Sequence, residues 1–114
     1  TLSKQYYKET NGYFDITIGS ISKKLYHFGE AKTYSPTPEA LKEAKLNIDG
    51  VYVDDKTIKS NEGIVVDLGG MGKGYAVNKV AALLNEKNIS RGIIALSGDI
   101  ECLHRCVLYL QSPF

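Results

Sequence analysis

The chain has 114 residues, of which 43% are hydrophobic and 24% charged, a composition typical of a globular protein and not of a disordered tail. Fourteen basic residues stand against thirteen acidic ones, so the net charge of +1 disfavours nucleic acid or an anionic membrane as the main partner. No apolar run approaches the roughly 18–20 residues of a membrane span, and two cysteines are too few for a disulfide scaffold. These exclusions favour a small-molecule site, a protein partner, or a piece of a larger protein.

Both ends of the chain favour a piece of a larger protein. Thr1 is not an initiator methionine, and no basic segment with an apolar core follows it as in a signal peptide. Near the other end, the strand-like run Val107–Leu110 is followed only by residues 111–114. We therefore expect residues 1–114 to be a single domain or a fragment of one.

The first half of the chain is predicted to contain two helices. Apolar residues at helical spacing predict a helix over residues 18–28, with Asp15 or Thr17 at its N-cap and Gly29 at its C-terminal cap. Two more local signals are a turn at Asn11-Gly12 after the polar residues 4–11, and a helix start at Thr37-Pro38-Glu39 that predicts a short helix over about residues 38–45.

Strands are predicted mainly in the second half. The segments predicted as strands are Val51–Val53 and Thr57–Ser60 around the turn Asp54-Asp55-Lys56, then Ile64–Val66, Gly92–Leu96, and a final pair after Ser97-Gly98-Asp99. The strongest helix signal is the broad apolar stripe over Tyr75–Lys87. The order strand, glycine-rich loop, helix and strand over residues 64–96 predicts a right-handed parallel crossover. We expect a mixed α/β (α+β) fold in which helices pack on a mixed sheet.

The loop over residues 67–75, Asp-Leu-Gly-Gly-Met-Gly-Lys-Gly-Tyr, carries the strongest functional signal. Glycine lets a backbone approach a ligand with no Cβ in the way. The predicted helix begins directly after it, and a helix N-terminus offers unpaired N–H groups and a partial positive charge to an anion. Lys73 adds a full positive charge. The loop therefore predicts a phosphate-bearing ligand, with close packing of helix on strand as the alternative reason for its glycines.

Two familiar phosphate-binding loops are excluded by single residues. A P-loop requires glycine where Asp67 stands and a hydroxyl residue where Gly74 stands. The dinucleotide fingerprint requires a third glycine where Tyr75 stands.

Three segments resemble motifs of the ApbE family of flavin transferases. Residues 11–19, Asn-Gly-Tyr-Phe-Asp-Ile-Thr-Ile-Gly, resemble its Gly-Ala-Phe-Asp-Pro-Thr-Val-Gly segment. Residues 66–78 resemble its Asp-Leu-Gly-Gly-Ile-Ala-Lys-Gly-Tyr-Ala-Val-Asp motif. Residues 94–100, Ile-Ala-Leu-Ser-Gly-Asp-Ile, resemble the strand end that carries its Gly-Gly-Asp motif. Three motifs in the family's order make the resemblance specific.

The resemblance implies an incomplete ApbE-like fold, related to the T-fold, and the activity of an FAD:protein FMN transferase. Such enzymes bind FAD and Mg²⁺, cleave the pyrophosphate, and attach FMN through a phosphoester bond to Thr or Ser of an acceptor flavoprotein. Some relatives only hydrolyse FAD to FMN and AMP. Many are periplasmic and lipid-anchored, so the family implies a membrane only through an anchor that this sequence does not show.

The resemblance also assigns site residues. Those that fall on the family's flavin-binding stretches are Tyr13, Phe14, Asp15, Gly69, Gly70, Lys73 and Tyr75. Gly72 falls on an alanine whose backbone carbonyl is a magnesium ligand in the family, and glycine keeps that carbonyl. This sequence departs from the family motifs at four positions. Tyr13 and Gly72 replace alanines, Asn78 replaces an aspartate, and Ser97 replaces a glycine. The resemblance assigns no catalytic side chain to this sequence.

Other family segments have no counterpart in this sequence. The family's later His-Ile-Ile-Asp-Pro segment and its Asp and Thr magnesium ligands lie beyond Phe114 in the motif order, and an N-terminal segment that touches FAD lies before Thr1. We therefore expect the chain to be the central part of such an enzyme, inactive on its own. The rival interpretations are a flavin- or nucleotide-binding module without catalysis, and a structural fragment without a ligand.

The remaining reactive side chains give weaker signals. On a strand, Cys102, His104 and Cys106 lie ~7 Å apart from one to the next, too far for one tetrahedral zinc ion. A Cys102–Cys106 disulfide is disfavoured because four extended residues span ~13 Å. The role of these residues stays open. Tyr6, Tyr7 and Tyr13 are candidates to stack on a flavin or adenine ring.

Overall fold

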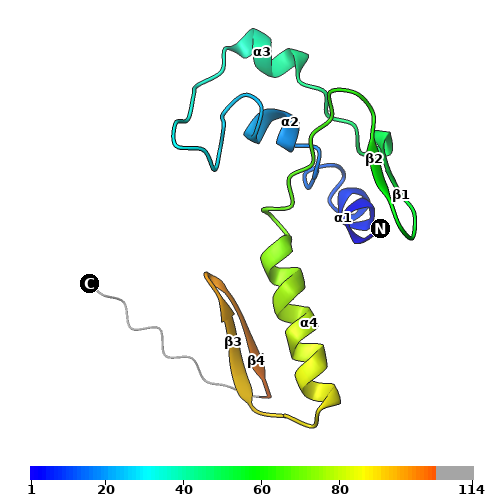
Figure 1. Ribbon diagram of the computed structural model, residues 1–114, viewed down its shortest axis with the longest axis vertical. Helices are drawn as coiled ribbons and strands as arrows, with labels where there is room; N and C mark the ends of the chain where they lie inside the picture. The colour runs from blue at the N-terminus through cyan, green and yellow to red at the C-terminus, as the bar shows by residue number, and fades with distance from the viewer. Residues whose placement is uncertain (105–114) are drawn as a thin grey trace. The chain divides into compact units, whose positions relative to one another are not determined.

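The computed structural model describes residues 1–104; the predicted strand Val107–Leu110 and Cys106 lie outside the described residues. The chain divides into two compact units, Thr1–Leu68 and Gly69–Phe114. Figure 1 labels their helices and strands in chain order. The prediction of one domain or a fragment of one stays a prediction.

The N-terminal unit begins with the helix α1, Leu2–Glu9, in a segment for which the sequence predicted only a polar run and a turn. The Tyr6 ring of this helix packs edge-on against Phe14, with ring centroids 5.8 Å apart. The predicted turn at Asn11-Gly12 is confirmed, because both residues have a positive φ and the Gly12 N–H donates to the Tyr7 carbonyl over 2.8 Å.

The predicted helix over residues 18–28 is wrong in length. Only α2, Gly19–Ser22, is α-helical, and its N-cap is Ile18. After it, the N–H groups of Lys24 and Tyr26 donate to the carbonyls five residues back, at 3.3 and 3.0 Å, which widens the turns beyond α-helical geometry. His27 then takes a φ of +55°, so the chain leaves the helical path before the predicted cap at Gly29.

The helix α3, Pro38–Glu43, starts where the sequence predicts. The Thr37 hydroxyl caps it by accepting from the Ala40 N–H over 3.2 Å. The helix ends two residues before the predicted Lys45, because Ala44 has extended backbone angles.

A 3₁₀ turn, Ile48–Gly50, leads into the hairpin of β1, Val51–Val53, and β2, Ile58–Ser60. The strands are antiparallel, with Val51 opposite Ser60 and Val53 opposite Ile58. The predicted turn between them is confirmed: the Asp54 carboxylate accepts from the N–H of Lys56 and from the N–H and hydroxyl of Thr57, at 2.7–2.8 Å.

These bonds predict an acid-sensitive hairpin. The Lys56 N–H, followed by the Thr57 hydroxyl and N–H, lowers the pKa of Asp54. Since the folded pKa lies below the unfolded value of about 4, the stabilisation is complete above that value and is lost as the pH falls through the folded pKa. Asp54→Ala is expected to lower stability at pH 7 and to reduce its loss on acidification. Urea unfolding at pH 7 and pH 2.5 measures both, with Asp55→Ala as the control; an unchanged pH dependence in Asp54→Ala would contradict the assignment.

The core of the N-terminal unit brings the hairpin together with two connecting segments. Ile16, Ile48, Val51 and Ile64 are buried. The predicted strand Ile64–Val66 is extended but pairs through one parallel bridge, between Val65 and Ile18. The predicted crossover would pair Ile64–Val66 with Gly92–Leu96. Because Gly92–Leu96 belongs to the C-terminal unit, the crossover stays a prediction.

In the C-terminal unit, the helix α4, Gly72–Glu86, packs against both strands of one antiparallel hairpin (Figure 1). The hairpin joins β3, Gly92–Leu96, to β4, Asp99–Leu103, with Leu96 opposite Asp99. Val77, Ala81 and Leu103 are buried between helix and hairpin. The helix begins three residues before the predicted Tyr75, inside the glycine run.

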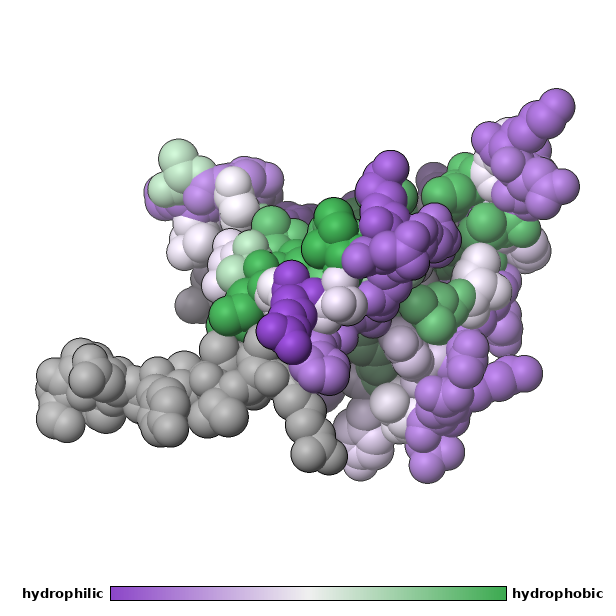
Figure 2. Space-filling model, turned by 90° about the horizontal axis from the view of Figure 1, so that it is seen from below, coloured by the Kyte–Doolittle hydropathy of each residue, from purple (hydrophilic) through white to green (hydrophobic). Residues whose placement is uncertain are grey.

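This mixture of helices and antiparallel strands confirms the predicted mixed α/β class. Many large apolar side chains stay exposed, and Figure 2 shows apolar residues reaching the surface between hydrophilic ones on the face that it draws. Among the described residues, none of the helices has both the length and the apolar character to cross a bilayer.

Candidate functional site

In the N-terminal unit, the predicted residues Tyr13, Phe14 and Asp15 lie in the turn between α1 and α2. Tyr13 is 97% exposed, so its ring is open to a ligand. Phe14 is half-buried against Tyr6, and its N–H donates to the Thr10 hydroxyl over 2.9 Å. The turn therefore holds Phe14 in place and presents Tyr13 to solvent.

Asp15 caps the turn that leads into α2. Its Oδ1 accepts from the N–H and the hydroxyl of Thr17, over 2.8 and 2.7 Å. Thr17 is fully buried, so this capping interaction anchors the start of α2 in the core. The predicted N-cap at Asp15 or Thr17 is wrong for α2, which begins after Ile18, although Asp15 does cap the turn before it. Its contact with a flavin stays a prediction.

Asp67, at the end of the same unit, has a role that the sequence did not reveal. Its N–H donates to the Ile16 carbonyl over 2.8 Å, and its Oδ2 accepts from the Ser22 hydroxyl over 2.6 Å. Lys23 Nζ lies 3.8 Å from the same oxygen. Asp67 thus joins the segment just before the glycine run to α2. Ser22 and Asp67 are 45 residues apart in the sequence, so no local pattern predicts their contact.

In the C-terminal unit, the glycine run is the first turn of α4. Met71 is the N-cap and offers no side-chain oxygen, and Gly72, Lys73 and Gly74 follow it in the helix. The Tyr75 N–H donates to the Met71 carbonyl over 2.9 Å, so the N–H groups of the three residues before it have no acceptor within the helix. This turn presents N–H groups and the exposed Lys73 ammonium, an arrangement suited to an anion.

The turn between β3 and β4 belongs to the motif of residues 94–100, and it lies beside the glycine-rich motif of residues 66–78 at the start of α4. Asp99 Oδ1 lies 3.5 Å from the position that a Cβ on Gly74 would take. A carboxylate therefore stands beside the first turn of α4, where the sequence assigned Asp99 only to a turn. Ser97, which replaces a family glycine, has a φ of +57°, the left-handed region that favours glycine.

The other predicted residues of this unit also lie at the start of α4. Gly69 and Gly70 form the exposed turn before it. Tyr75 is half-exposed, and Lys79 Nζ lies 5.4 Å from its ring centroid, one turn along the helix. Gly69, Gly70, Gly72, Lys73 and Tyr75 are thus brought together, while Tyr13, Phe14 and Asp15 belong to the other unit.

The described residues do not fit a complete magnesium site. Magnesium prefers six oxygen ligands, usually with one or two carboxylates. The Gly72 carbonyl lies in the first turn of α4, where the helical ladder directs it to the N–H four residues on. Within residues 1–104, no three His, Cys, Asp or Glu side chains gather as a metal site would require.

Cys102 lies in β4 opposite Ile93, and the role of the Cys102, His104 and Cys106 set stays open.

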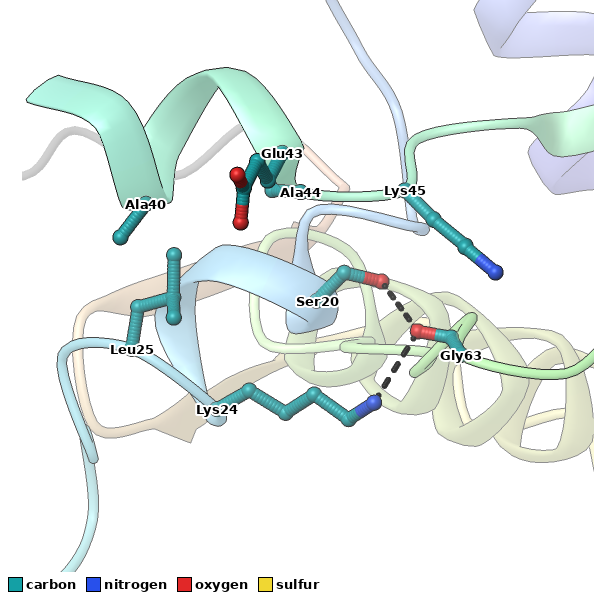
Figure 3. A pocket seen from close by; sticks show the side chains of 8 residues that line it. All are labelled: Ser20, Lys24, Leu25, Ala40, Glu43, Ala44, Lys45 and Gly63. Atoms are coloured by element: carbon teal, nitrogen blue, oxygen red, sulfur yellow. Dashed lines mark hydrogen bonds between the residues drawn. The ribbon is translucent and has the colours of Figure 1, made fainter.

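A hollow of about 280 Å³ lies between α2 and α3 in the N-terminal unit (Figure 3). Ser20, 3% exposed, stands in its wall, accepts from the Val65 N–H over 3.0 Å, and donates to the Gly63 carbonyl over 3.4 Å. Lys24 Nζ donates to the same carbonyl over 3.2 Å. These bonds hold the segment before the glycine run against α2, and none of the sequence-predicted site residues lines this hollow.

The sequence pattern of the ApbE family matches residues 1–106. The chain therefore belongs to the ApbE family.

Curated relatives carry the name FAD:protein FMN transferase. The protein of Haemophilus influenzae is 32% identical over 102 aligned residues, which cover 82% of this chain and 29% of that protein. The protein of Klebsiella pneumoniae is 30% identical over 109 residues, covering 88% of this chain and 31% of that protein. The chain thus spans less than a third of the length of these relatives.

Solved structures agree with the family assignment. The ApbE protein of Thermotoga maritima matches with a TM-score of 0.77 and 25% identity, over 90% of this chain and 35% of that one. The flavin transferase ApbE of Vibrio cholerae matches with a TM-score of 0.74 and 27% identity, over 89% of this chain and 34% of that one. The predicted ApbE-like, incomplete fold is confirmed.

Proposed function

We propose that this chain is the central part of an FAD:protein FMN transferase, which attaches FMN to a Thr or Ser side chain of an acceptor flavoprotein. The activity is the one that the curated relatives are named for. The proposal is supported by the start of α4 inside the glycine run, because three helix N–H groups and Lys73 then share one turn of a kind suited to an anion.

In this proposal the first turn of α4 holds the pyrophosphate of FAD. Negative charge at a helix N-terminus is favourable because the dipole and the unpaired N–H groups act on it together. Gly72 and Gly74 have no side chains of their own to obstruct the phosphate oxygens, although the Asp99 carboxylate lies beside Gly74. Apart from the chain neighbours of Gly72 and the backbone of its own helix, no described heavy atom lies within 4 Å of the position that a Cβ on Gly72 would take. Lys73 neutralises part of the phosphate charge, which also favours phosphoryl transfer.

The flavin ring is assigned to the aromatic side chains. Tyr13 is open to solvent and Tyr75 is half-exposed, so each offers a ring face for stacking. The other predicted flavin-binding residues are Phe14 and Asp15 in the N-terminal unit, and Gly69 and Gly70 in the C-terminal unit. The described donors do not make a magnesium site, so the Gly72 carbonyl as a magnesium ligand stays a prediction.

Ligand choice tests the proposal. The chain should bind FAD about tenfold more tightly than riboflavin, because riboflavin lacks the phosphates that α4 and Lys73 would hold, a difference of about 1.4 kcal/mol. Quenching of flavin fluorescence, measured in one buffer for FAD, FMN and riboflavin, gives the three dissociation constants. Equal affinities for FAD and riboflavin would show that the turn does not bind the pyrophosphate.

A further inference from the structure

The loop between α2 and α3 gathers aromatic side chains on the surface of the N-terminal unit. Residues 26–34, here called the aromatic loop, have their ends joined by the Tyr34 N–H, which donates to the Tyr26 carbonyl over 3.1 Å. Lys23 Nζ donates to the Phe28 carbonyl over 3.0 Å and fastens the loop to the end of α2. A compact surface loop with close ends and its own internal packing is frequently functional.

The rings of the aromatic loop pack on one another and still face solvent. Tyr26 and Phe28 stack with centroids 5.1 Å apart, and the rings of His27 and Tyr34 lie 4.9 Å apart. Phe28 is 51% and Tyr34 50% exposed. Single exposed apolar side chains are ordinary, but a held group of aromatic rings is typical of the centre of a protein interface.

The charge around the aromatic loop is positive. Residues 23–34 contain three lysines and a single acidic residue, Glu30, which lies 3.1 Å from His27 Nδ1. Lys23 already pairs with Asp67 over 3.8 Å, so the positive charge of this surface comes from Lys24 and Lys32. Lys32 Nζ lies 5.2 Å from the Tyr34 ring centroid, so a cation stands directly beside an exposed ring. A partner that covers the rings therefore gains by bringing carboxylates to the lysines.

We propose that the aromatic loop is the docking surface for an acidic segment of the protein that accepts FMN. The identity of that partner rests on the proposed function, because a transferase that acts on a protein must hold its partner while the hydroxyl reaches the phosphate. In this arrangement Phe28 and Tyr34 are the anchors, and Lys24 and Lys32 attract the acidic segment and set its orientation.

A peptide titration of the isotope-labelled 114-residue chain tests the docking surface without any flavin. The probe is a synthetic twelve-residue peptide of alternating Glu and Leu with one Tyr, and its partner peptide has Lys in place of every Glu. Amide signals of residues 23–34 should shift with the Glu peptide only, and the affinity should fall as salt rises. The double variant Phe28→Ser, Tyr34→Ser should bind at least about tenfold more weakly, as expected for two anchors.

Matched variants distinguish specific binding at the aromatic loop from nonspecific binding of the peptide to exposed rings and charges. Tyr52→Ser removes a tyrosine of similar exposure, 55%, from β1 and should leave peptide binding unchanged. Lys32→Glu should weaken binding about threefold or more, whereas Lys59→Glu on β2 should not. Equal binding of both peptides, shifts outside residues 23–34, or unchanged affinity in the double variant would overturn the proposal.

Two further measurements distinguish this proposal from its alternatives. Vesicles with 30% anionic lipid should not bind through the loop, and vesicle binding that the double variant loses would overturn the proposal in favour of a membrane surface. FAD affinity, measured separately, should be the same in the wild type and the double variant. A chain that binds FAD but not the Glu peptide overturns only the docking surface, whereas one that binds the peptide but not FAD supports the surface and contradicts the proposed function.

Discussion

Replacing Gly19 by alanine is expected to cost the N-terminal unit about 3 kcal/mol of stability, the upper part of the range for overpacked interiors. A Cβ on Gly19 would lie 2.5 Å from the Val65 carbonyl oxygen and 2.9 Å from the carbonyl carbons of Val65 and Val66. These are backbone atoms, and the Val65–Ile18 bridge and the Asp67–Ser22 hydrogen bond hold that segment in place. The clash therefore cannot be relieved by a change of rotamer.

Urea unfolding, followed by the amide signals of the N-terminal unit, measures the loss at Gly19. Gly72→Ala is the control. Apart from its chain neighbours and the backbone of its own helix, no described heavy atom lies within 4 Å of its Cβ position, and alanine in a helix is favoured over glycine by about 0.5–1 kcal/mol. One glycine substitution should thus destabilise and the other should not. An unchanged midpoint for Gly19→Ala would contradict the close approach of α2 to the segment before the glycine run.

Lys73→Glu is expected to weaken FAD binding by roughly 30- to 100-fold, or about 2–3 kcal/mol, because a charge-assisted contact to the pyrophosphate is replaced by repulsion. Riboflavin affinity should change little. The fold should not suffer, since an acidic side chain in the first turn of a helix is favourable to the helix dipole. A variant that folds at least as well and binds FAD much more weakly separates a binding role from a structural one.

The control for Lys73 is Lys87→Glu, which changes the net charge of the chain by the same amount at the other end of α4. Its FAD affinity should stay within about threefold of the wild type once salt screens distant charges. Similar losses in both variants would indicate a general effect of net charge and contradict the assignment of Lys73 to the phosphate site. Fluorescence titration at 50 and 200 mM salt distinguishes the two cases.

The sequence predicted most reliably the features whose causes are local. The Thr37 cap and the Asp54 turn depend on side chains that bond to backbone groups two or three residues away, so their pattern is visible in the residue order. The strand Gly92–Leu96 and the turn that follows it were also predicted, but not the antiparallel pairing of β3 with β4 around a two-residue loop. The three motifs likewise identified the family, which the comparisons confirm.

The wrong or missed predictions have physical causes that cannot be detected from the spacing of apolar residues. Apolar periodicity cannot detect the first turn of α4, because Gly72 and Gly74 have no side chain to contribute to it. The helix predicted over residues 18–28 has suitable spacing, but widened turns and the positive φ of His27 end it early. The contact between Ser22 and Asp67 depends on tertiary packing, and so does the approach of Asp99 to Gly74.

The two glycines at the start of α4 make its first turn the part of the helix that is entropically hardest to keep ordered. Glycine loses more conformational freedom on ordering than any other residue, and the first turn has the fewest hydrogen bonds to offset that loss. A phosphate that accepts the N–H groups of residues 72–74 would fix this turn, so binding and local ordering are coupled. Phosphate binding at this turn should therefore slow amide hydrogen exchange at residues 72–74. The measured affinity for phosphate is lower than the intrinsic one, because part of the binding free energy is spent on ordering the turn.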